Sequence, residues 1–275
     1  MTRIAVLQST TGIDPAANAA HLVEKVRQAK AGGAGMMFTP EMSGLLDRSR
    51  DRAATNIVAE GEDRVLAAVR EAAAKEGLWT ALGSLAIRRD DGRLANRSFV
   101  IDAGGAIAAR YDKMHMFDVT LASGESWRES AAYVPGDDVV TVPGTPVGRL
   151  GLSVCYDIRF PALFEELGRQ GCDVIAIPAA FTVPTGQAHW HLLQRARAVE
   201  ASAWVVAAAQ VGEHEDGRRT YGHSLVADPW GDIVVDMGGE AAGLAFAEID
   251  PARTAEIRAQ LPSLANRRPI PRFVE

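Results

Sequence analysis

Three polar residues in this sequence each follow an apolar run that predicts a β-strand. Glu41 follows MMFTP, Lys113 follows a run that ends at Tyr111, and Cys155 follows LSV. Loops at the carboxyl ends of the strands of an open α/β sheet converge, and ligands bind there. A carboxylate, an ammonium group and a thiol that meet at such an edge would supply a base, a positive charge and a nucleophile.

Cys155 alone supports two interpretations. It lies in GLSVCYDIRFP, between a predicted strand and a predicted helix at 160–170. A helix N-terminus and a cation would both stabilise its thiolate, yet free cysteine is also among the residues most often buried in cores. It is therefore either a nucleophile or a small core residue. Cys172 lies between that helix and a buried run, where we expect it to be structural.

Glu41 and Lys113 also have simpler interpretations when each is considered alone. A glutamate after a strand is often only a favourable carboxylate at a helix N-terminus. A lysine at a strand end is usually solvated. Their types and positions indicate catalysis only in combination with Cys155.

The hydrophobic pattern predicts strands that alternate with helices, with hairpins between them. Strands are expected at residues 3–8, 36–38, 78–85, 98–101, 107–111, 139–142, 149–155, 173–178, 204–209, 223–227, 233–236 and 244–249. Helices are expected after Asp14-Pro15 and at 60–76, 160–170, 189–201 and 251–261, and residues 112–138 form a long irregular segment. This order predicts an α/β fold with mixed sheets. No linker or repeat divides the chain, so residues 1–275 are expected to form a single domain.

The composition excludes several classes of protein. Hydrophobic residues make up 47% and charged residues 23%, and the net charge is −6, which argues against a nucleic-acid-binding face. No run of about 18 apolar residues predicts a membrane span, and the N-terminus has no apolar segment of the signal-peptide type. Two cysteines cannot build a disulfide framework and fit a reducing compartment. We therefore expect a cytoplasmic protein.

Five blocks of the sequence together resemble the nitrilase superfamily, the carbon–nitrogen hydrolases. They are FTPEMSG at 38–44, RYDKMHMFDV at 110–119, GLSVCYDIRFP at 151–161, AHWHLLQRARAVE at 188–200 and YGHSLVADPWG at 221–231. The resemblance extends over essentially the whole chain. It implies a four-layer αββα sandwich, in which two sheets pack face to face between helices.

The resemblance implies a Glu–Lys–Cys triad at Glu41, Lys113 and Cys155. Cys155 would attack an amide carbonyl and form a thioester, with Glu41 as general base and acid. Lys113 and the backbone N–H of Tyr156 would stabilise the oxyanion. The close carboxylate and ammonium groups are expected to titrate as a coupled pair.

Further residues would support the triad and bind the substrate. The resemblance places a supporting glutamate at Glu129, with Glu125 as the competing assignment. Arg159 is the leading candidate to bind a substrate carboxylate, although an ion pair with Asp157 or with the loops beside Glu41 is the alternative. Phe181 and Thr185 match substrate-contacting positions of the family, and core packing is the alternative for Phe181.

The blocks at 151–161, 188–200 and 221–231 look most like the branch of deaminated glutathione amidases and ω-amidases. WVVAAAQVGEHEDG, from Trp204 to Gly217, looks closer to the former. The resemblance therefore implies hydrolysis of a 2-oxoglutaramyl amide, with deaminated glutathione or 2-oxoglutaramate as substrate. Two other classes stay open, namely a catalytically silent protein on this scaffold and a redox sensor that pairs Cys155 with Cys172.

Neither a metal nor a cofactor is predicted. The histidines have no H-E-x-x-H or C-x-x-C context, and we expect His115, His189 and His223 to have structural or supporting roles. No phosphate-binding loop or dinucleotide fingerprint is present. The family resemblance implies a homodimer or larger homo-oligomer, with the helices at 160–170 and 189–201 at the interface.

Overall fold

The computed structural model describes residues 1–121, 124 and 126–269 of the chain. Two six-stranded sheets form its centre. The first sheet has the order β16-β1-β2-β3-β4-β5 and the second has the order β15-β14-β11-β10-β9-β8. Both sheets contain parallel and antiparallel pairs, as β1 pairs with β2 in parallel and with β16 antiparallel, and β10 pairs with β9 in parallel while β8 pairs with β9 antiparallel. The predicted mixed α/β character is confirmed.

The strands of the first sheet are β1 (Thr2–Gln8), β2 (Met36–Phe38), β3 (Trp79–Arg88), β4 (Leu94–Ile101), β5 (Ile107–Asp112) and β16 (Gly243–Ile249). Those of the second sheet are β8 (Thr141–Thr145), β9 (Gly148–Leu152), β10 (Val174–Ala176), β11 (Trp204–Ala207), β14 (Leu225–Ala227) and β15 (Ile233–Asp236). Two small ribbons, β6–β7 (Asp118–Thr120 and Ser126–Arg128) and β12–β13 (Val211–Glu213 and Arg219–Tyr221), lie outside the sheets.

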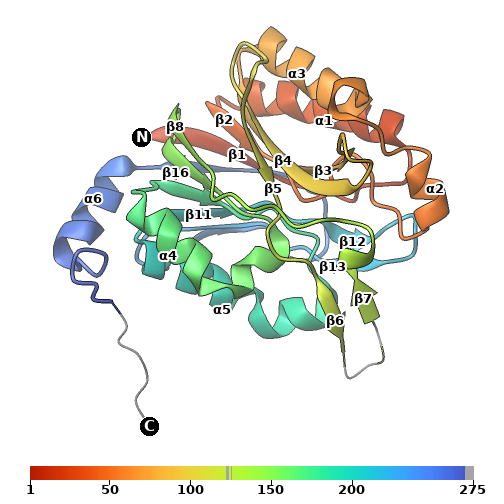
Figure 1. The fold of residues 1–275 in the computed structure, drawn as a ribbon. Helices are drawn as coiled ribbons and strands as arrows, with labels where there is room; N and C mark the ends of the chain where they lie inside the picture. Colours follow the sequence, from red (N-terminus) through yellow and green to blue (C-terminus); the bar gives the residue numbers. More distant parts are fainter. Residues whose placement is uncertain (122–123, 125, 270–275) are drawn as a thin grey trace.

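Helices cover the outer faces of the two sheets (Figure 1). α1 (Pro15–Ala31) and α3 (Arg64–Glu76) lie on the first sheet, and α4 (Pro161–Arg169) and α5 (Val183–Ala201) lie on the second. The short α2 (Arg50–Ala54) and α6 (Pro251–Gln260) lie at the two sides. The arrangement is the four-layer αββα sandwich that the resemblance implied.

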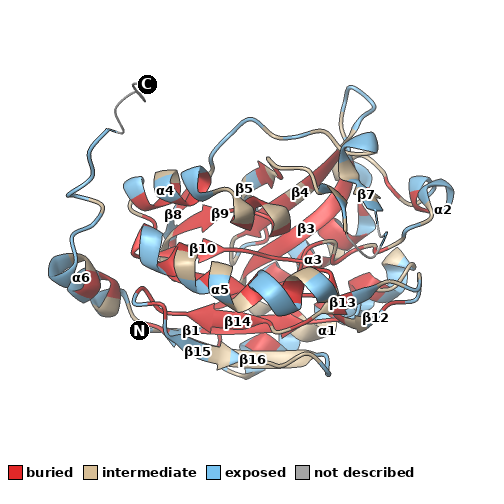
Figure 2. Cartoon of the chain, turned by 90° about the horizontal axis from the view of Figure 1, so that it is seen from below, coloured by how far each residue is buried: buried red, intermediate tan, exposed pale blue. Residues whose placement is uncertain are grey.

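The largest hydrophobic core lies between the sheets. Ile4 and Met36 of the first sheet belong to the same buried cluster as Leu150 and Val174 of the second. Strands that are buried on both faces read as continuous apolar runs rather than alternating ones, and Figure 2 shows the central strands as a buried block. A second cluster, with Leu22 of α1 as a member, joins α1 and α3 to the first sheet.

Local sequence signals explain the main helix boundaries. Asp14 caps α1 by accepting a 2.8 Å hydrogen bond from the Ala16 amide, and Pro15 occupies the first turn. Asp63 caps α3 in the same way, and Gly77 ends it with a left-handed backbone.

Most element boundaries differ by a few residues from the sequence expectation, and the expected helix at 60–76 is divided into a 3₁₀ turn at Glu60–Glu62 and α3. α5 begins at Val183 rather than at 189, β9 ends at Leu152 rather than at 155, and the irregular segment at 112–138 contains the β6–β7 ribbon. α2 and the β12–β13 ribbon were not predicted. No helix among the described residues is both long enough and apolar enough to cross a membrane.

Candidate active site

The three predicted triad residues come together at the junction of the two sheets. Glu41 follows β2 and Lys113 follows β5, so both come from the first sheet, whereas Cys155 follows β9 of the second. All three are buried, with 5%, 2% and 7% of their surfaces exposed. Buried charges are costly unless they are paired and hydrogen-bonded, so the partners of these residues define the site.

Lys113 is paired with two carboxylates. Its Nζ lies 3.1 Å from Glu41 Oε1 and 2.8 Å from Glu129 Oε2. Burial alone would lower the pKa of Lys113, but the charges of Glu129 and Glu41 outweigh it and hold this pKa well above its ordinary value. The lysine is therefore a fixed ammonium group.

The two oxygens of Glu41 have different partners. Oε1 accepts hydrogen bonds from Lys113 Nζ and, at 2.9 Å, from Asn96 Nδ2. Oε2 accepts a 2.8 Å hydrogen bond from the Ala180 amide. The carboxylate also accepts a hydrogen bond from the Cys155 thiol. Burial raises the pKa of Glu41, yet Lys113 and these hydrogen bonds lower it overall. The carboxylate is therefore ionised and stands ready to take a proton.

Cys155 lies at a sharp turn. Its φ of 51° is left-handed, which is uncommon for a residue other than glycine, and its amide donates a 2.8 Å hydrogen bond to the Pro178 carbonyl. Such strain persists only where the surroundings hold it.

The expectation that a helix N-terminus and a cation keep Cys155 as a thiolate is wrong for the resting site. Burial, followed by the charge of Glu41, raises the pKa of the Cys155 thiol well above its ordinary value, although Lys113 lowers it. A short 3₁₀ turn begins at Cys155, and α4 begins only at Pro161, so the predicted helix does not begin at the nucleophile. The resting site is therefore a thiol beside a carboxylate base.

Asp157 holds the turn that presents the nucleophile. This fully buried carboxylate accepts hydrogen bonds of 2.8 Å from the Val154 amide and from the Tyr111 hydroxyl. It also accepts a 3.0 Å hydrogen bond from the His115 amide and lies 2.7 Å from His115 Nδ1. Because Tyr111 and His115 flank Lys113, Asp157 fixes the lysine segment to the nucleophile turn. The expected structural role of His115 agrees with these contacts.

Glu129 lies beside Lys113, as one of the two assignments expected. Both Glu129 oxygens contact Lys113 Nζ, at 3.0 and 2.8 Å, and Oε2 also accepts a 2.7 Å hydrogen bond from the Phe117 amide. Glu125 lies outside the described residues.

Asn96 is a site residue that the sequence reasoning missed. It belongs to β4, and its Nδ2 bridges the two glutamates at 2.9 and 3.2 Å from their Oε1 atoms. Its backbone carbonyl accepts a 2.9 Å hydrogen bond from the Lys113 amide. The sequence offered little signal, because Asn96 is followed by Arg97 and Ser98 and lies before the strand that was expected at 98–101.

Gly83 allows the loop with Glu41 to lie directly on β3. A Cβ atom at this position would lie 2.1 Å from the Thr39 carbonyl oxygen and 2.3 Å from that of Pro40. Only glycine leaves room for so close an approach. On the other side, Gln210 Nε2 donates a 2.9 Å hydrogen bond to the Glu41 carbonyl.

Tyr156 has a backbone amide that is available for an oxyanion. The amides of Cys155 and Asp157 donate hydrogen bonds to the carbonyls of Pro178 and Val154. The Tyr156 amide donates a hydrogen bond to no other residue in the part of the chain that the structure describes. A free amide next to a nucleophile is the geometry that acyl-transfer enzymes use to bind the oxyanion.

Arg159 is not held by a carboxylate. Its guanidinium carbon lies 5.9 Å from the ring centre of Tyr156 and 5.5 Å from that of Phe181, and its nitrogens lie 3.4 Å from His189 Nδ1. Within the described residues it forms no ion pair, so the alternative pair with Asp157 is not present. The guanidinium is therefore free to receive an anion.

Of the remaining predicted substrate residues, Phe181 lies beside Arg159. Phe181 is 4% exposed and packs on Trp190 with a ring separation of 5.0 Å, so it also contributes to the core. Thr185 lies in the first turn of α5, where its hydroxyl is 2.8 Å from that of Thr182.

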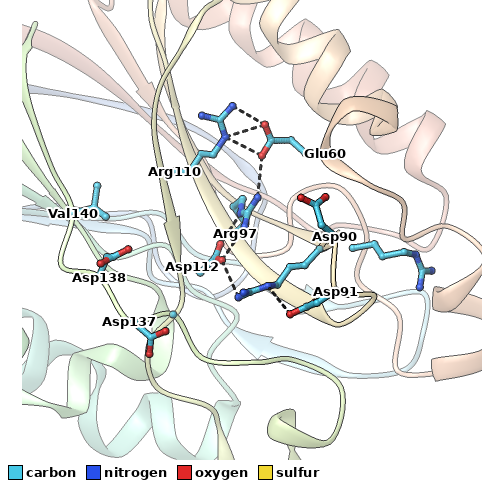
Figure 3. Close-up of a pocket in the computed structure, with 12 residues that line it drawn as sticks. Glu60, Asp90, Asp91, Arg97, Arg110, Asp112, Asp137, Asp138 and Val140 are labelled. Carbon is cyan, nitrogen blue, oxygen red and sulfur yellow. Dashed lines mark hydrogen bonds and ion pairs between the residues drawn. The ribbon is translucent and has the colours of Figure 1, made fainter.

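A separate cavity of about 700 Å³ is lined almost entirely by charged residues and contains no triad residue (Figure 3). Several of its arginines pair with its acids, since Arg97 contacts Asp112 at 2.6 Å and Glu60 at 3.0 Å, and Arg110 contacts Glu60. This cavity lacks a nucleophile or an apolar wall for a substrate, and we do not assign it to the active site.

Both cysteines are free thiols. Burial raises the pKa of Cys172 to about 12, and its sulfur lies against Gly151. Such a thiol is a poor partner for disulfide exchange, which agrees with the structural role expected for Cys172.

Comparison with known proteins identifies the family. The model of the carbon–nitrogen hydrolase family matches residues 3–259. A deaminated glutathione amidase from Yersinia enterocolitica is 38% identical over 96% of this chain and 92% of its own length. The human deaminated glutathione amidase is also 38% identical, over 97% of this chain and 82% of its own.

Solved structures agree with this result. The NitFhit protein of Caenorhabditis elegans superposes with a TM-score of 0.88 at 35% identity, over 97% of this chain and 65% of its own. Nit3 of Saccharomyces cerevisiae, a nitrilase-superfamily member, gives 0.84 at 26% identity, over 95% and 94%. An amidase from Nesterenkonia, whose active-site cysteine has added acrylamide, gives 0.79 at 25% identity, over 96% and 99%. The chain therefore belongs to the carbon–nitrogen hydrolase family and is a hydrolase that acts on amides.

Proposed function

We propose that this enzyme hydrolyses the amide of 2-oxoglutaramyl compounds through a Cys155 thioester, and that deaminated glutathione is its preferred substrate. The observation that supports the mechanism best is the environment of Glu41. One of its oxygens accepts hydrogen bonds from Lys113 and Asn96, and the carboxylate also accepts a hydrogen bond from the Cys155 thiol. The support for the substrate is the high identity to amidases named for deaminated glutathione over nearly the whole chain.

In the first half-reaction, the Cys155 sulfur attacks the amide carbonyl carbon while the thiol proton passes to Glu41. The carbonyl oxygen becomes an oxyanion, which Lys113 Nζ and the Tyr156 amide stabilise. The carbon–nitrogen bond then breaks, and the leaving amine takes the proton from Glu41. The acyl group stays on Cys155 as a thioester.

In the second half-reaction, Glu41 takes a proton from a water molecule, whose oxygen attacks the thioester carbonyl. The carbon–sulfur bond breaks, the acid is released, and the sulfur recovers the proton from Glu41. Glu129 acts by holding Lys113, which it contacts at 2.8 Å. One base therefore serves both steps without a histidine.

The substrate's 2-oxo acid group would bind Arg159. This guanidinium has no carboxylate partner among the described residues, and aromatic rings border it. A bidentate arginine–carboxylate contact is a strong, oriented interaction. Phe181 borders Arg159, and Phe181 and Thr185 would complete the acyl subsite.

The test is kcat/KM for deaminated glutathione and for 2-oxoglutaramate, measured side by side with Cys155→Ala as the blank. Preference for deaminated glutathione supports the proposal. Preference for 2-oxoglutaramate would instead make the protein an ω-amidase, because both substrates contain the same acyl group and differ in the leaving amine. Activity of the Cys155→Ala variant on either substrate would refute the thioester mechanism.

We also propose that the chain forms a homodimer or a larger homo-oligomer through α4 and α5. Leu192 and Val199 on α5 are 66% and 41% exposed, and Trp230 next to this helix is 49% exposed. Exposed apolar groups gathered on one face favour association. A cytoplasmic location is proposed with it, because the reaction requires Cys155 to stay reduced.

A further inference from the structure

Three side chains able to bind a metal ion meet on the second sheet, outside the triad. They are His191 of α5, His223 just before β14 and Asp236 at the end of β15. One ligand atom from each lies within 4.8 Å of the other two. Figure 2 shows α5 running alongside β14 and β15, so three separate elements contribute to the cluster.

The distances within the cluster are close to those of a metal site. Asp236 Oδ2 lies 2.9 Å from His191 Nε2 and 3.2 Å from His223 Nδ1. In a tetrahedral zinc site with bonds of about 2.0–2.1 Å, neighbouring ligand atoms are about 3.3 Å apart. The two pairs that include Asp236 therefore need only small shifts. The histidine nitrogens lie within 4.8 Å of each other, and a rotation of the His191 ring would bring them closer.

The backbone around His223 is held firmly. Its amide donates a 2.8 Å hydrogen bond to the Gly238 carbonyl, and its own carbonyl accepts a 2.8 Å hydrogen bond from Trp190 Nε1. Its φ of 54° is left-handed, so an imidazole stands where the backbone favours glycine. The ring stacks on Tyr221 with centres 4.4 Å apart. This ring is fixed before any ion binds.

Asp236 is oriented and its charge is not balanced by a permanent cation. Its Oδ1 accepts a 2.9 Å hydrogen bond from the Gly238 amide, the kind of outer contact that orients a metal-binding carboxylate. Within the described residues it forms ion pairs with neither lysine nor arginine, and its partners are His191 and His223. A bound dication would balance this charge when both imidazoles are neutral.

The cluster is accessible from solvent. The side chains of His191, His223 and Asp236 are 33%, 25% and 32% exposed. An ion can therefore enter and keep a water molecule in its remaining position. Two imidazoles and one carboxylate suit zinc, whereas magnesium and calcium prefer oxygen ligands alone.

We propose that His191, His223 and Asp236 form a zinc-binding site that links α5 to the β14–β15 pair. The ion would act on stability rather than on the reaction, because none of the three side chains contacts a triad residue. The sequence argued against a metal because its histidines are scattered; the fold brings two of them to one carboxylate.

The experiment uses the full chain, without a histidine tag and freed of metal by a chelator, with Cys155→Ala as the parent. This background removes a thiol that itself binds zinc, and it makes the result independent of the proposed amidase function. Zinc chloride is titrated calorimetrically into the parent and into Asp236→Asn, His191→Ala and His21→Ala. His21 is an exposed histidine on α1 and provides the matched control.

We expect one zinc ion per parent chain, the same affinity in His21→Ala, and at least a tenfold weaker affinity in Asp236→Asn and His191→Ala. Zinc should also raise the thermal midpoint of the parent and of His21→Ala, but not that of Asp236→Asn. Absence of binding to the parent overturns the proposal. So does equal affinity in the parent and in Asp236→Asn, a nearly isosteric variant whose folding is checked by its thermal transition without metal.

Discussion

Asn96 Nδ2 donates a 2.9 Å hydrogen bond to Glu41 Oε1, the same oxygen that contacts Lys113. This amide also reaches Glu129 at 3.2 Å, so a neutral donor lies between two carboxylates that share one ammonium group. Without such a donor the two negative charges would repel each other more strongly. Asn96 is therefore a positioning residue for the base.

We expect Asn96→Ala to lower kcat by about tenfold or more while KM changes little. The substitution disturbs the orientation of the base Glu41 but leaves the substrate pocket unchanged. The hydrogen bond from Asn96 helps to lower the pKa of Glu41. Its loss should raise this pKa, and the acid limb of the kcat/KM profile should move to higher pH. A pH series of initial rates measures both effects.

Ser98→Ala is the control for Asn96, because Ser98 lies on the same strand and contacts the Leu82 carbonyl rather than a carboxylate. It should leave the acid limb in place. An unshifted limb in Asn96→Ala would show that Asn96 contributes only to packing.

Cys155→Ala should reduce turnover to the level of the blank while the fold stays intact. The sulfur forms the covalent bond to the acyl group, and no other side chain can replace it. The variant loses one buried atom, so its thermal midpoint should change by only a few degrees. Circular dichroism and a product assay measure the two results, and residual turnover above about one part in a thousand would contradict the proposed nucleophile.

The same variant isolates a stability effect at alkaline pH. The folded thiol has a raised pKa, so its contribution to stability is complete below the ordinary cysteine value near 8.5. Above this value the unfolded thiol ionises while the folded one keeps its proton, and the folded state loses stability as the pH rises. Between pH 7 and pH 10 the wild type should lose more free energy of unfolding than Cys155→Ala. Equal losses in urea titrations would show that the folded thiol is not perturbed.

Gly83→Ala should damage the base through the backbone. Its Cβ atom would lie 2.1 Å from the Thr39 carbonyl oxygen, so the loop with Glu41 has to move. We expect a loss of about 1–3 kcal/mol in the free energy of unfolding. We also expect kcat to fall by more than the decrease in the fraction of folded protein explains. Gly61→Ala is the matched control, because a Cβ atom there meets nothing within 4 Å. Normal activity of Gly83→Ala would mean that the loop adapts.

Leu192→Glu tests the proposed subunit interface. A charge on this 66% exposed side chain would be unfavourable in an apolar contact and harmless on a free surface. We expect a smaller mass by light scattering coupled to gel filtration. Glu200→Gln, at an exposed position on the same helix, should leave the mass unchanged. An unchanged mass of Leu192→Glu would place any interface elsewhere.

The sequence predicted most strands because their apolar runs are long and bounded by turn residues. It missed the start of α5 because residues 183–188 contain Pro184 and Gly186, which are typical of loops. In the structure Pro184 fits the first helical turn, and Gly186 makes room for the Tyr221 ring, which a Cβ atom would meet at 2.2 Å. That ring belongs to a distant segment, so the reason for the glycine is tertiary.

The candidate site shows the same limit. Motif resemblance located Glu41, Lys113, Glu129 and Cys155, because their sequence blocks are distinctive. The protonation of Cys155 could not be predicted, since it depends on burial and on the distance to Glu41. The role of Asn96 depends on its facing two carboxylates from different loops, and a strand pattern alone does not show which polar side chain points inward.

The separation of the triad between two sheets has a consequence for the synthesis of the chain. Glu41 and Lys113 are translated before Cys155, but the Ala180 amide that fixes the base follows β10 of the second sheet. A chain that ends before this point lacks one of the hydrogen bonds that orient Glu41. The pair of thiol and carboxylate therefore forms only when the two sheets pack together, and a chain without the second sheet has Glu41 without its nucleophile.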